Sequence, residues 1–279
     1  MRESTSFKAL RAVTLTLITA MVLLPLYVIL VSSFKPLTDV SGPFTWLPER
    51  FTLDPYVQMW STIPLAQYLG NSVLVTSAST LLALAIGILA AYSLSRLRWF
   101  GQRSFSLVVL STQMFPGILF LLPLYLMFTQ LQRAVGVQLN GSYTGLILTY
   151  MTFSVPFATW MLMGFFAAIP TELEEAAMVD GTTRLGALFR VLLPVARPGI
   201  VAVGVFTFLN GWGEVLFASV LTTRDTRTLA VGLQAFSTQT DVRWNEMMAA
   251  SIVISLPVLI AFLLVQRHLV QGLAAGAVK

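Results

Sequence analysis

Six apolar stretches constrain this chain more than any other feature of its sequence. They lie at roughly residues 12–32, 68–94, 105–131, 143–168, 200–221 and 248–265. A helix needs about 20 mostly apolar residues to cross the hydrocarbon core of a bilayer. Only 10% of the residues are charged, whereas a soluble domain has about 25%. The pattern predicts an all-α, polytopic membrane protein with six transmembrane helices, built as a single transmembrane domain over residues 12–268.

The distribution of basic residues predicts how the spans are oriented. If the N-terminus lies inside, the inner segments hold 11 of the 17 Lys and Arg residues, and basic residues are retained on the cytoplasmic side. We therefore expect residues 1–11, 169–198 and 269–279 to be cytoplasmic. Arg2, Lys8 and Arg11 before an apolar run also fit a signal peptide. No convincing cleavage site follows, and the run is long enough to span, which favours a retained first helix.

The segment 169–198 carries the signals of a short helix. Pro170 blocks continuation of the fourth span. Thr171 and Glu174 have the spacing at which a hydroxyl and a carboxylate cap each other's backbone amides, so a helix should begin near Glu172. Three glutamates in its first turn, at 172, 174 and 175, favour the positive end of the helix dipole.

A second short helix should follow a turn in the same segment. Asp180-Gly181 supplies the left-handed residue with which helices often end. Apolar residues then recur at helical spacing until Pro194 and Pro198, which we expect to end the helix; they are Leu185, Leu188, Phe189 and Leu192. The prediction is two short helices joined at Gly181.

The composition excludes several kinds of chemistry. The chain has no cysteine and one histidine, His268, which removes thiolate and most metal or Ser-His chemistry. Its three lysines follow no glycine-rich turn, so no P-loop is present. We expect no catalytic residue, metal site or cofactor on this chain. The net charge of +5 is explained by topology and anionic lipid headgroups, without a nucleic-acid partner.

The sequence between residues 175 and 194 resembles the cytoplasmic signature of one family. In the integral membrane subunits of binding-protein-dependent ATP-binding-cassette (ABC) importers, this signature runs Glu-Ala-Ala, three residues, Gly, nine residues, Ile-x-Leu-Pro. Val191 stands here in place of the usual Ile. The matching residues are Glu175, Ala176, Ala177, Gly181, Leu193 and Pro194, with Asp180 before the Gly. The alternative is an ordinary amphipathic loop at the membrane interface.

Other segments are similar to the carbohydrate, maltose-type branch of that family. They are residues 71–72, 90–96, 113–117 and 272–279, so the resemblance covers nearly the whole chain. In the last segment Ala274 replaces the usual Thr. The resemblance implies a tail that reaches into the ATPase dimer, and a frayed terminus is the alternative.

The resemblance implies a non-catalytic permease subunit of a sugar importer in a prokaryotic inner membrane. Its partners are a second homologous permease, two copies of an ABC ATPase that bind ATP and magnesium, an extracytoplasmic solute-binding protein and membrane lipid. Eight residues are expected to couple the permease to the ATPase: Glu174, Glu175, Ala176, Ala177, Asp180, Gly181, Leu193 and Pro194. An ion-coupled carrier and a non-transporting scaffold remain alternatives, and the solute is left open.

Glu214 is expected to be the one charge within a span. A charge at a helix centre costs about 2.5–3.5 kcal/mol on insertion scales, so Glu214 should face the bundle or a watery cavity. With Asn210 and Trp212 it partly matches a Trp-Asn-Glu cluster of related permeases. These three residues are candidates for the translocation pathway, and an interhelical hydrogen-bond clamp is the favoured alternative. Apolar residues of the third span are expected to pack or face lipid; they include Met114, Phe115 and Phe120.

Overall fold

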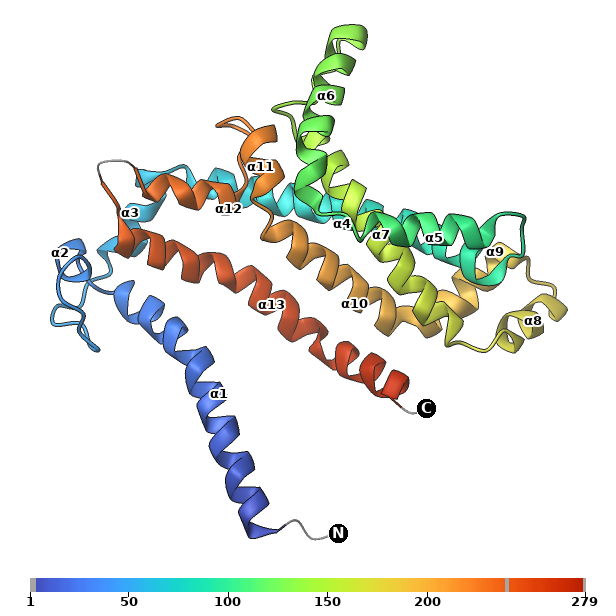
Figure 1. Cartoon of the computed structure of the whole chain (residues 1–279), viewed down its shortest axis with the longest axis horizontal. Helices are drawn as coiled ribbons and strands as arrows, with labels where there is room; N and C mark the ends of the chain where they lie inside the picture. The colour runs from blue at the N-terminus through green and yellow to red at the C-terminus, as the bar shows by residue number, and fades with distance from the viewer. Residues whose placement is uncertain (1–3, 239–240, 278–279) are drawn as a thin grey trace. The chain divides into compact units, whose positions relative to one another are not determined.

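The computed structural model describes residues 4–238 and 241–277, and helices form nearly all of its regular structure (Figure 1). Within these residues the only β pairing is an isolated bridge between Ser237 and Val242. The helices are α1 (Thr5–Ser32), α2 (Leu37–Val40), α3 (Asp54–Thr62), α4 (Leu65–Arg96), α5 (Gln102–Thr112), η1 (Gly117–Phe120), α6 (Leu121–Val135), α7 (Tyr143–Ala167), α8 (Glu172–Val179), α9 (Arg184–Ala187), η2 (Leu188–Leu192), α10 (Leu193–Trp212), α11 (Leu216–Leu221), α12 (Leu229–Gly232), η3 (Leu233–Phe236) and α13 (Trp244–Ala277).

Six helical segments of the described chain are long and apolar enough to cross a membrane, which agrees with the predicted fold class. They are Ser6–Ser32, Leu65–Arg96, Gly117–Val135, Tyr143–Ala167, Arg184–Trp212 and Trp244–Leu263. Two of the predicted spans have wrong bounds. Pro116 separates α5 from the third crossing segment, because proline disfavours a helical residue before it. The fifth begins 16 residues earlier than expected, at Arg184 instead of residue 200, and ends at Trp212.

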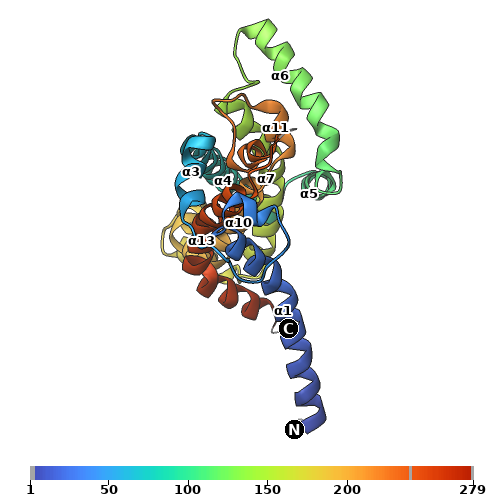
Figure 2. The ribbon, with the colours of Figure 1, turned by 90° about the vertical axis from the view of Figure 1, so that its left-hand side faces the viewer.

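The chain forms two compact units, and the first comprises residues 1–66 and 232–256. Its helix α1 is capped by Ser4, whose hydroxyl accepts a hydrogen bond from the Phe7 amide at 3.3 Å. Nearly all of α1 is exposed, and it extends away from α2 and α3 (Figures 1 and 2). Such an apolar, uncovered helix suits contact with lipid or with another membrane subunit.

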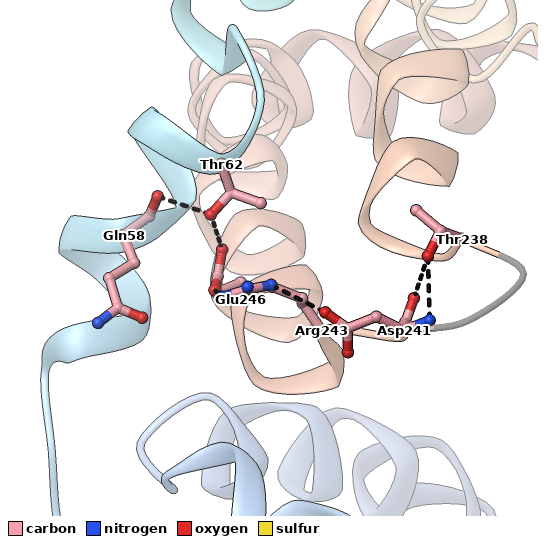
Figure 3. Close-up of polar contacts among 6 residues, drawn as sticks. All are labelled: Gln58, Thr62, Thr238, Asp241, Arg243 and Glu246. Carbon is pink, nitrogen blue, oxygen red and sulfur yellow. Dashed lines mark hydrogen bonds and ion pairs between the residues drawn. The ribbon is translucent and has the colours of Figure 1, made fainter.

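A polar network in this unit joins α3 to the start of α13 (Figure 3). Glu246 is 1% exposed and accepts a hydrogen bond from the Thr62 hydroxyl. Arg243 Nη1 lies 3.0 Å from Glu246 Oε1, and its Nε lies 3.4 Å from Asp241 Oδ2. The hydrogen bond to Glu246, and then the charge of Glu246, raise the pKa of Arg243. The buried carboxylate therefore has partners on both elements, as burial requires.

The second unit, residues 67–231 and 257–279, contains two hydrophobic clusters that share α7. One packs residues of α4, α6, α7 and α11, including Leu146 and Phe217. The other packs α4, α7, η2 and α10, including Leu162 and Leu192. Helix α7 is therefore the central element of this unit. By contrast, most of α6 is exposed, and it extends away from α7 and α11 in both views (Figures 1 and 2).

Helix α13 continues to Ala277, so residues 269–277 are helical rather than frayed. Contact of this segment with an ATPase dimer stays a prediction. Arg2 and Lys279, which contributed to the predicted charge bias, lie outside the described residues.

Candidate coupling loop and membrane cavity

Helix α8 begins at Glu172, as predicted, but the expected reciprocal cap is absent. Thr171 is itself in a helical conformation and its side chain caps no backbone amide. Glu174 instead turns inward and is 5% exposed. The prediction was wrong because a guanidinium lies within reach of this carboxylate, and a charge-assisted hydrogen bond is stronger than a bond to a backbone amide.

Arg96, the last residue of α4, is the partner of Glu174. Its Nε donates to Glu174 Oε1 at 2.6 Å, and its Nη2 donates to the Ile169 carbonyl at 2.7 Å. The two side chains are only 8% and 7% exposed. One buried guanidinium thus holds α8 and the link from α7 onto the end of α4. The sequence analysis missed this pair, although Arg96 is the first basic residue after the second apolar stretch.

The turn after α8 has the predicted geometry. Gly181 has φ +90°, in the left-handed region, and a Cβ built there would meet no atom within 4 Å. The Thr183 hydroxyl then caps α9 by accepting a hydrogen bond from the Gly186 amide at 3.1 Å. The predicted turn at Gly181 between two helices is therefore confirmed.

The expected end of the second helix at Pro194 and Pro198 is wrong. A π-helical turn, η2, follows α9 and leads directly into α10. Pro194 lies in the first turn of α10, where a missing amide hydrogen matters least, and the wider π turn precedes it. Pro198 lies inside α10. The loop is consequently continuous with the fifth span.

The loop has one buried face and one exposed face. On the buried face, Ala187, Leu188 and Leu192 are fully covered. The exposed face combines acidic, basic and large apolar side chains, among them Val179 at 88% exposure. Its members are Glu172, Leu173, Glu175, Ala176, Val179, Asp180, Arg184, Leu185, Phe189 and Arg190, and we call it the loop face. Uncovered apolar residues with a polar rim are typical of a protein-binding surface.

The structure sorts the eight predicted coupling residues by exposure. Glu174 is buried against Arg96, so it positions the loop rather than meeting a partner. Ala177 and Leu193 are partly buried. The other five are exposed: Glu175, Ala176, Asp180, Gly181 and Pro194. Figure 1 shows α8 and α9 at the end of α10 that is remote from α11.

A cavity of about 460 Å³ lies elsewhere in the same unit. Residues of α7, α10 and α11 line it, together with Gln113 and Gly117. Its walls are largely aromatic: the Phe153 and Phe217 rings lie 4.9 Å apart, and Phe157 stacks on Phe206 at 4.6 Å. Its volume falls within the range of about 300–1,000 Å³ for small-molecule pockets.

Glu214 lines this cavity but does not lie within a span, contrary to the prediction. Helix α10 ends at Trp212, and Glu214 precedes α11. Its carboxylate accepts hydrogen bonds from the amides of Phe217 at 2.9 Å and Ala218 at 3.0 Å. These bonds cap α11, and the carboxylate lies at the positive end of that helix. The Tyr150 hydroxyl of α7 lies beside the same carboxylate, as an interhelical clamp requires.

The structure brings together two of the three predicted pathway residues. Asn210 and Glu214 both line the cavity, whereas Trp212 is stacked on Phe208 at 5.4 Å and is not among the lining residues. As expected, the apolar residues of the third region do not line it; Met114, Phe115 and Phe120 are exposed instead.

Tyr150 and Thr207 are among the lining residues that the sequence analysis missed. Both belong to helices that read as uniformly apolar, so no local signal marks them. In the part of the chain that the structure describes, no group of three or more His, Cys, Asp or Glu residues is placed to hold a metal ion.

These features define an integral membrane protein whose described residues include six apolar helical segments and a folded, exposed loop. The chain matches the family described as "Binding-protein-dependent transport system inner membrane component" over residues 83–275. It is 39% identical over 269 residues to the inner membrane ABC transporter permease protein YcjP of Escherichia coli, covering 95% of this chain and 94% of that one. The chain belongs to this family of transport system membrane components.

Two further relatives extend the likeness along the whole chain. The sulfoquinovosyl glycerol transport system permease protein SmoH of Agrobacterium fabrum is 37% identical, covering 98% of this chain and 95% of that one. The trehalose/maltose transport system permease protein MalG of Thermococcus litoralis is 31% identical, covering 100% and 99%. All three relatives are named as permease proteins.

A solved structure shares the fold. It is the crystal structure of a bacterial ABC transporter involved in the import of the acidic polysaccharide alginate. One of its chains superposes with a TM-score of 0.82 at 20% identity, covering 96% of this chain and 99% of that one. The architecture is thus that of an ABC importer permease.

Proposed function

We propose that this chain is one of two permease subunits of an ATP-driven sugar importer and that its loop face docks on the ATPase. The second permease is a homologue of this chain. Two copies of an ABC ATPase bind ATP and magnesium, and an extracytoplasmic solute-binding protein delivers the solute. This chain itself binds no nucleotide and performs no catalysis.

The single observation that carries the proposal is the two-sided loop. Its inner side is fixed to α4 by the buried Arg96–Glu174 pair, so α8 moves together with the membrane helix that holds it. Its outer side presents Glu175, Val179 and Phe189 to solvent. Closure of a partner that grips this face can therefore move packed helices as a rigid body.

Relatives support the choice of a sugar as the solute. Two of the relatives named above, MalG and SmoH, are assigned by name to trehalose or maltose and to sulfoquinovosyl glycerol. A third, from Streptomyces coelicolor, is named a diacetylchitobiose uptake system permease protein and is 34% identical over 98% of this chain. These names share carbohydrate chemistry, although they differ in the charge of the solute.

Both termini and the loop face are proposed to lie in the cytoplasm. The support is the bias of basic residues, because the short connection between the second and third apolar stretches carries Arg96, Arg98 and Arg103 and no acidic residue. A thiol introduced at Arg98, which is exposed and lies outside the loop face, tests the orientation, since the chain has no native cysteine. It should react with a membrane-impermeant maleimide in inverted vesicles and not in intact cells.

Co-purification tests the docking. The tagged chain is isolated in mild detergent as wild type and as Glu175→Arg, Val179→Asp and Gly181→Pro, and the proteins that accompany it are identified. Wild type should retain a P-loop ATPase and a second permease, and each variant should lose most of the ATPase. The two exposed-face variants leave the Arg96–Glu174 pair intact, so they separate docking from folding.

Val137→Asp is the matched control, because Val137 is also exposed and apolar but lies after α6. It should retain the ATPase. Recovery of an ATPase with both exposed-face variants at the wild-type amount would contradict the proposed docking surface, and recovery of no ATPase with wild type would contradict the importer itself.

A further inference from the structure

We infer that the cavity beside α11 is a site for an uncharged sugar unit and that Thr207 supplies a hydroxyl that binds it. The inference rests on the proposed function and adds a site and a charge class of solute to it. It depends on three features of the cavity: the unpartnered hydroxyl of Thr207, the aromatic walls and the charge.

The Thr207 hydroxyl is the first observation. Thr207 is 3% exposed and lines the cavity, yet its hydroxyl has no hydrogen-bond partner in the described residues. Buried threonines on neighbouring α7 behave differently: Thr149 donates to the Gly145 carbonyl and Thr159 to the Val155 carbonyl, both at 2.8 Å. The hydroxyls of Thr80 and Thr228 also lack a partner in the described residues but do not line this cavity. It is the position of Thr207 in the cavity wall that allows a ligand to complete its hydroxyl, since a buried hydroxyl without a partner is costly.

The Tyr150 hydroxyl lies in the same cavity but has a neighbour of its own. Tyr150 is 3% exposed, and its hydroxyl lies within reach of a hydrogen bond to the Glu214 carboxylate. Thr207 is therefore the better residue to mutate, because no charged group lies beside its hydroxyl to pair with it in the absence of a ligand.

The walls suit the faces of a sugar ring. Phe153, Phe157, Phe206 and Phe217 all line the cavity, and their faces can pack against the apolar C–H groups of a pyranose. Asn210 donates its amide nitrogen to the Phe206 carbonyl at 2.9 Å, so its amide oxygen remains to accept a hydrogen bond from a ligand hydroxyl. An aromatic cavity with a few polar groups is the usual form of a small-molecule site.

The charge of the cavity selects against anions. None of the described residues that line it is basic, and its one carboxylate, Glu214, is held by the amides of Phe217 and Ala218. A sulfonated or uronic acid solute would meet a fixed negative charge with no cation to offset it. The cavity therefore favours neutral sugars such as trehalose over the acidic solutes named for some relatives and structural neighbours.

Uptake into proteoliposomes tests the inference with the whole complex. The importer, purified with its partners, is given ATP and its binding protein and is assayed with trehalose, maltose and diacetylchitobiose as neutral probes and sulfoquinovosyl glycerol as the anionic one. For the transported neutral probe, Thr207→Val should raise KM roughly three- to tenfold, the loss expected for one hydrogen bond. Thr159→Val is the matched control and should leave KM unchanged.

Thermal stability separates a ligand site from a structural role. If Thr207 only supported the fold, Thr207→Val would lower the melting temperature; if it awaits a ligand, the melting temperature should be unchanged or higher because an unpartnered hydroxyl has been removed. Protection of a cavity thiol from a reagent measures directly whether the sugar occupies the cavity. A Ser154→Cys thiol in the cavity should be shielded by the neutral probe from a methanethiosulfonate reagent, and a Ser219→Cys thiol on exposed α11 should not.

The outcomes distinguish the two proposals. ATP-dependent uptake of none of the four probes would count against the proposed sugar importer. Uptake with unchanged KM in Thr207→Val and no shielding of Ser154→Cys would overturn the cavity assignment alone, and would fit a cavity filled by lipid or by the second permease. Preferential uptake of sulfoquinovosyl glycerol would overturn the neutral class of solute.

Discussion

The loop end and the cavity of the second unit bury polar groups in opposite ways. At the loop end, Arg96 and Glu174 are both more than nine-tenths covered and are paired at 2.6 Å. In the cavity, Thr207 is covered to a similar degree, and its hydroxyl has no hydrogen-bond partner in the described residues. Buried polar groups that are paired with each other make a rigid connection. A buried polar group that lacks a hydrogen-bond partner can instead be paired by a ligand.

This difference matches what each region is proposed to do. A loop that transmits movement must not deform, and an ion pair with a second hydrogen bond to the Ile169 carbonyl resists deformation. A transport site must bind its solute and release it, so its polar groups cannot be satisfied by the protein alone. Four stability measurements test the comparison.

The largest effect should come from breaking the ion pair. Arg96→Met leaves the Glu174 carboxylate buried without a partner, and the free energy of unfolding should fall by about 3–5 kcal/mol. Denaturant titration of the chain in detergent measures it. Arg98→Met is the control: this arginine is exposed and should cost less than about 0.5 kcal/mol. The double variant Arg96→Met with Glu174→Leu should recover most of the loss. Equal loss in Arg96→Met and Arg98→Met would show that the pair does not hold the loop.

Alanine substitution of two glycines tests the turn geometry of the loop. Both Gly181 and Gly164 have open space where a Cβ would lie, but only Gly181 has a left-handed backbone, at φ +90°. Gly181→Ala should lower the free energy of unfolding by roughly 1–2 kcal/mol. Gly164→Ala, inside α7, should raise it by roughly 0.5–1 kcal/mol. The same sign for both substitutions would contradict the turn geometry.

The cap at Glu214 should have a smaller effect. Glu214→Ala removes the acceptor for the amides of Phe217 and Ala218, at a cost of about 1 kcal/mol. Glu214→Gln keeps one carbonyl oxygen and should cost less. Hydrogen exchange of the two amides is the measurement, and unchanged protection in Glu214→Ala would show that the cap contributes little.

The smallest change in the free energy of unfolding is expected for Thr→Val substitutions. These are also the most discriminating, because the two threonines should respond differently. Thr159→Val removes a hydroxyl that donates to a carbonyl and should cost about 0.5–1.5 kcal/mol. Thr207→Val removes a hydroxyl without a partner and should cost nothing or stabilise the chain slightly. Comparable destabilisation by both would remove the distinction on which the cavity site rests.

The predictions from sequence succeeded where the signal was local. Glu172 as a helix start and Gly181 as a turn follow from the chemistry of a few adjacent residues, and both are confirmed. The errors lie where a residue contacts a partner distant in the sequence, or where the helix beside it changes its hydrogen-bond pattern. Glu174 was expected to cap its own helix and instead binds Arg96, which is 78 residues away in the chain. Pro194 was expected to end a helix that in fact continues through a π turn.

The sequence by itself determined the class of protein, six spans of helix and the position of a folded loop, since hydropathy, Gly, Pro and charge act over one or two turns of chain. Only the tertiary structure decided which side chains meet. It buried Glu174 against Arg96, moved Glu214 from a span to the start of α11, and gathered Tyr150 and Thr207 around one cavity. Contacts between distant helices depend on packing, and packing has no signature in the local pattern of a uniformly apolar segment.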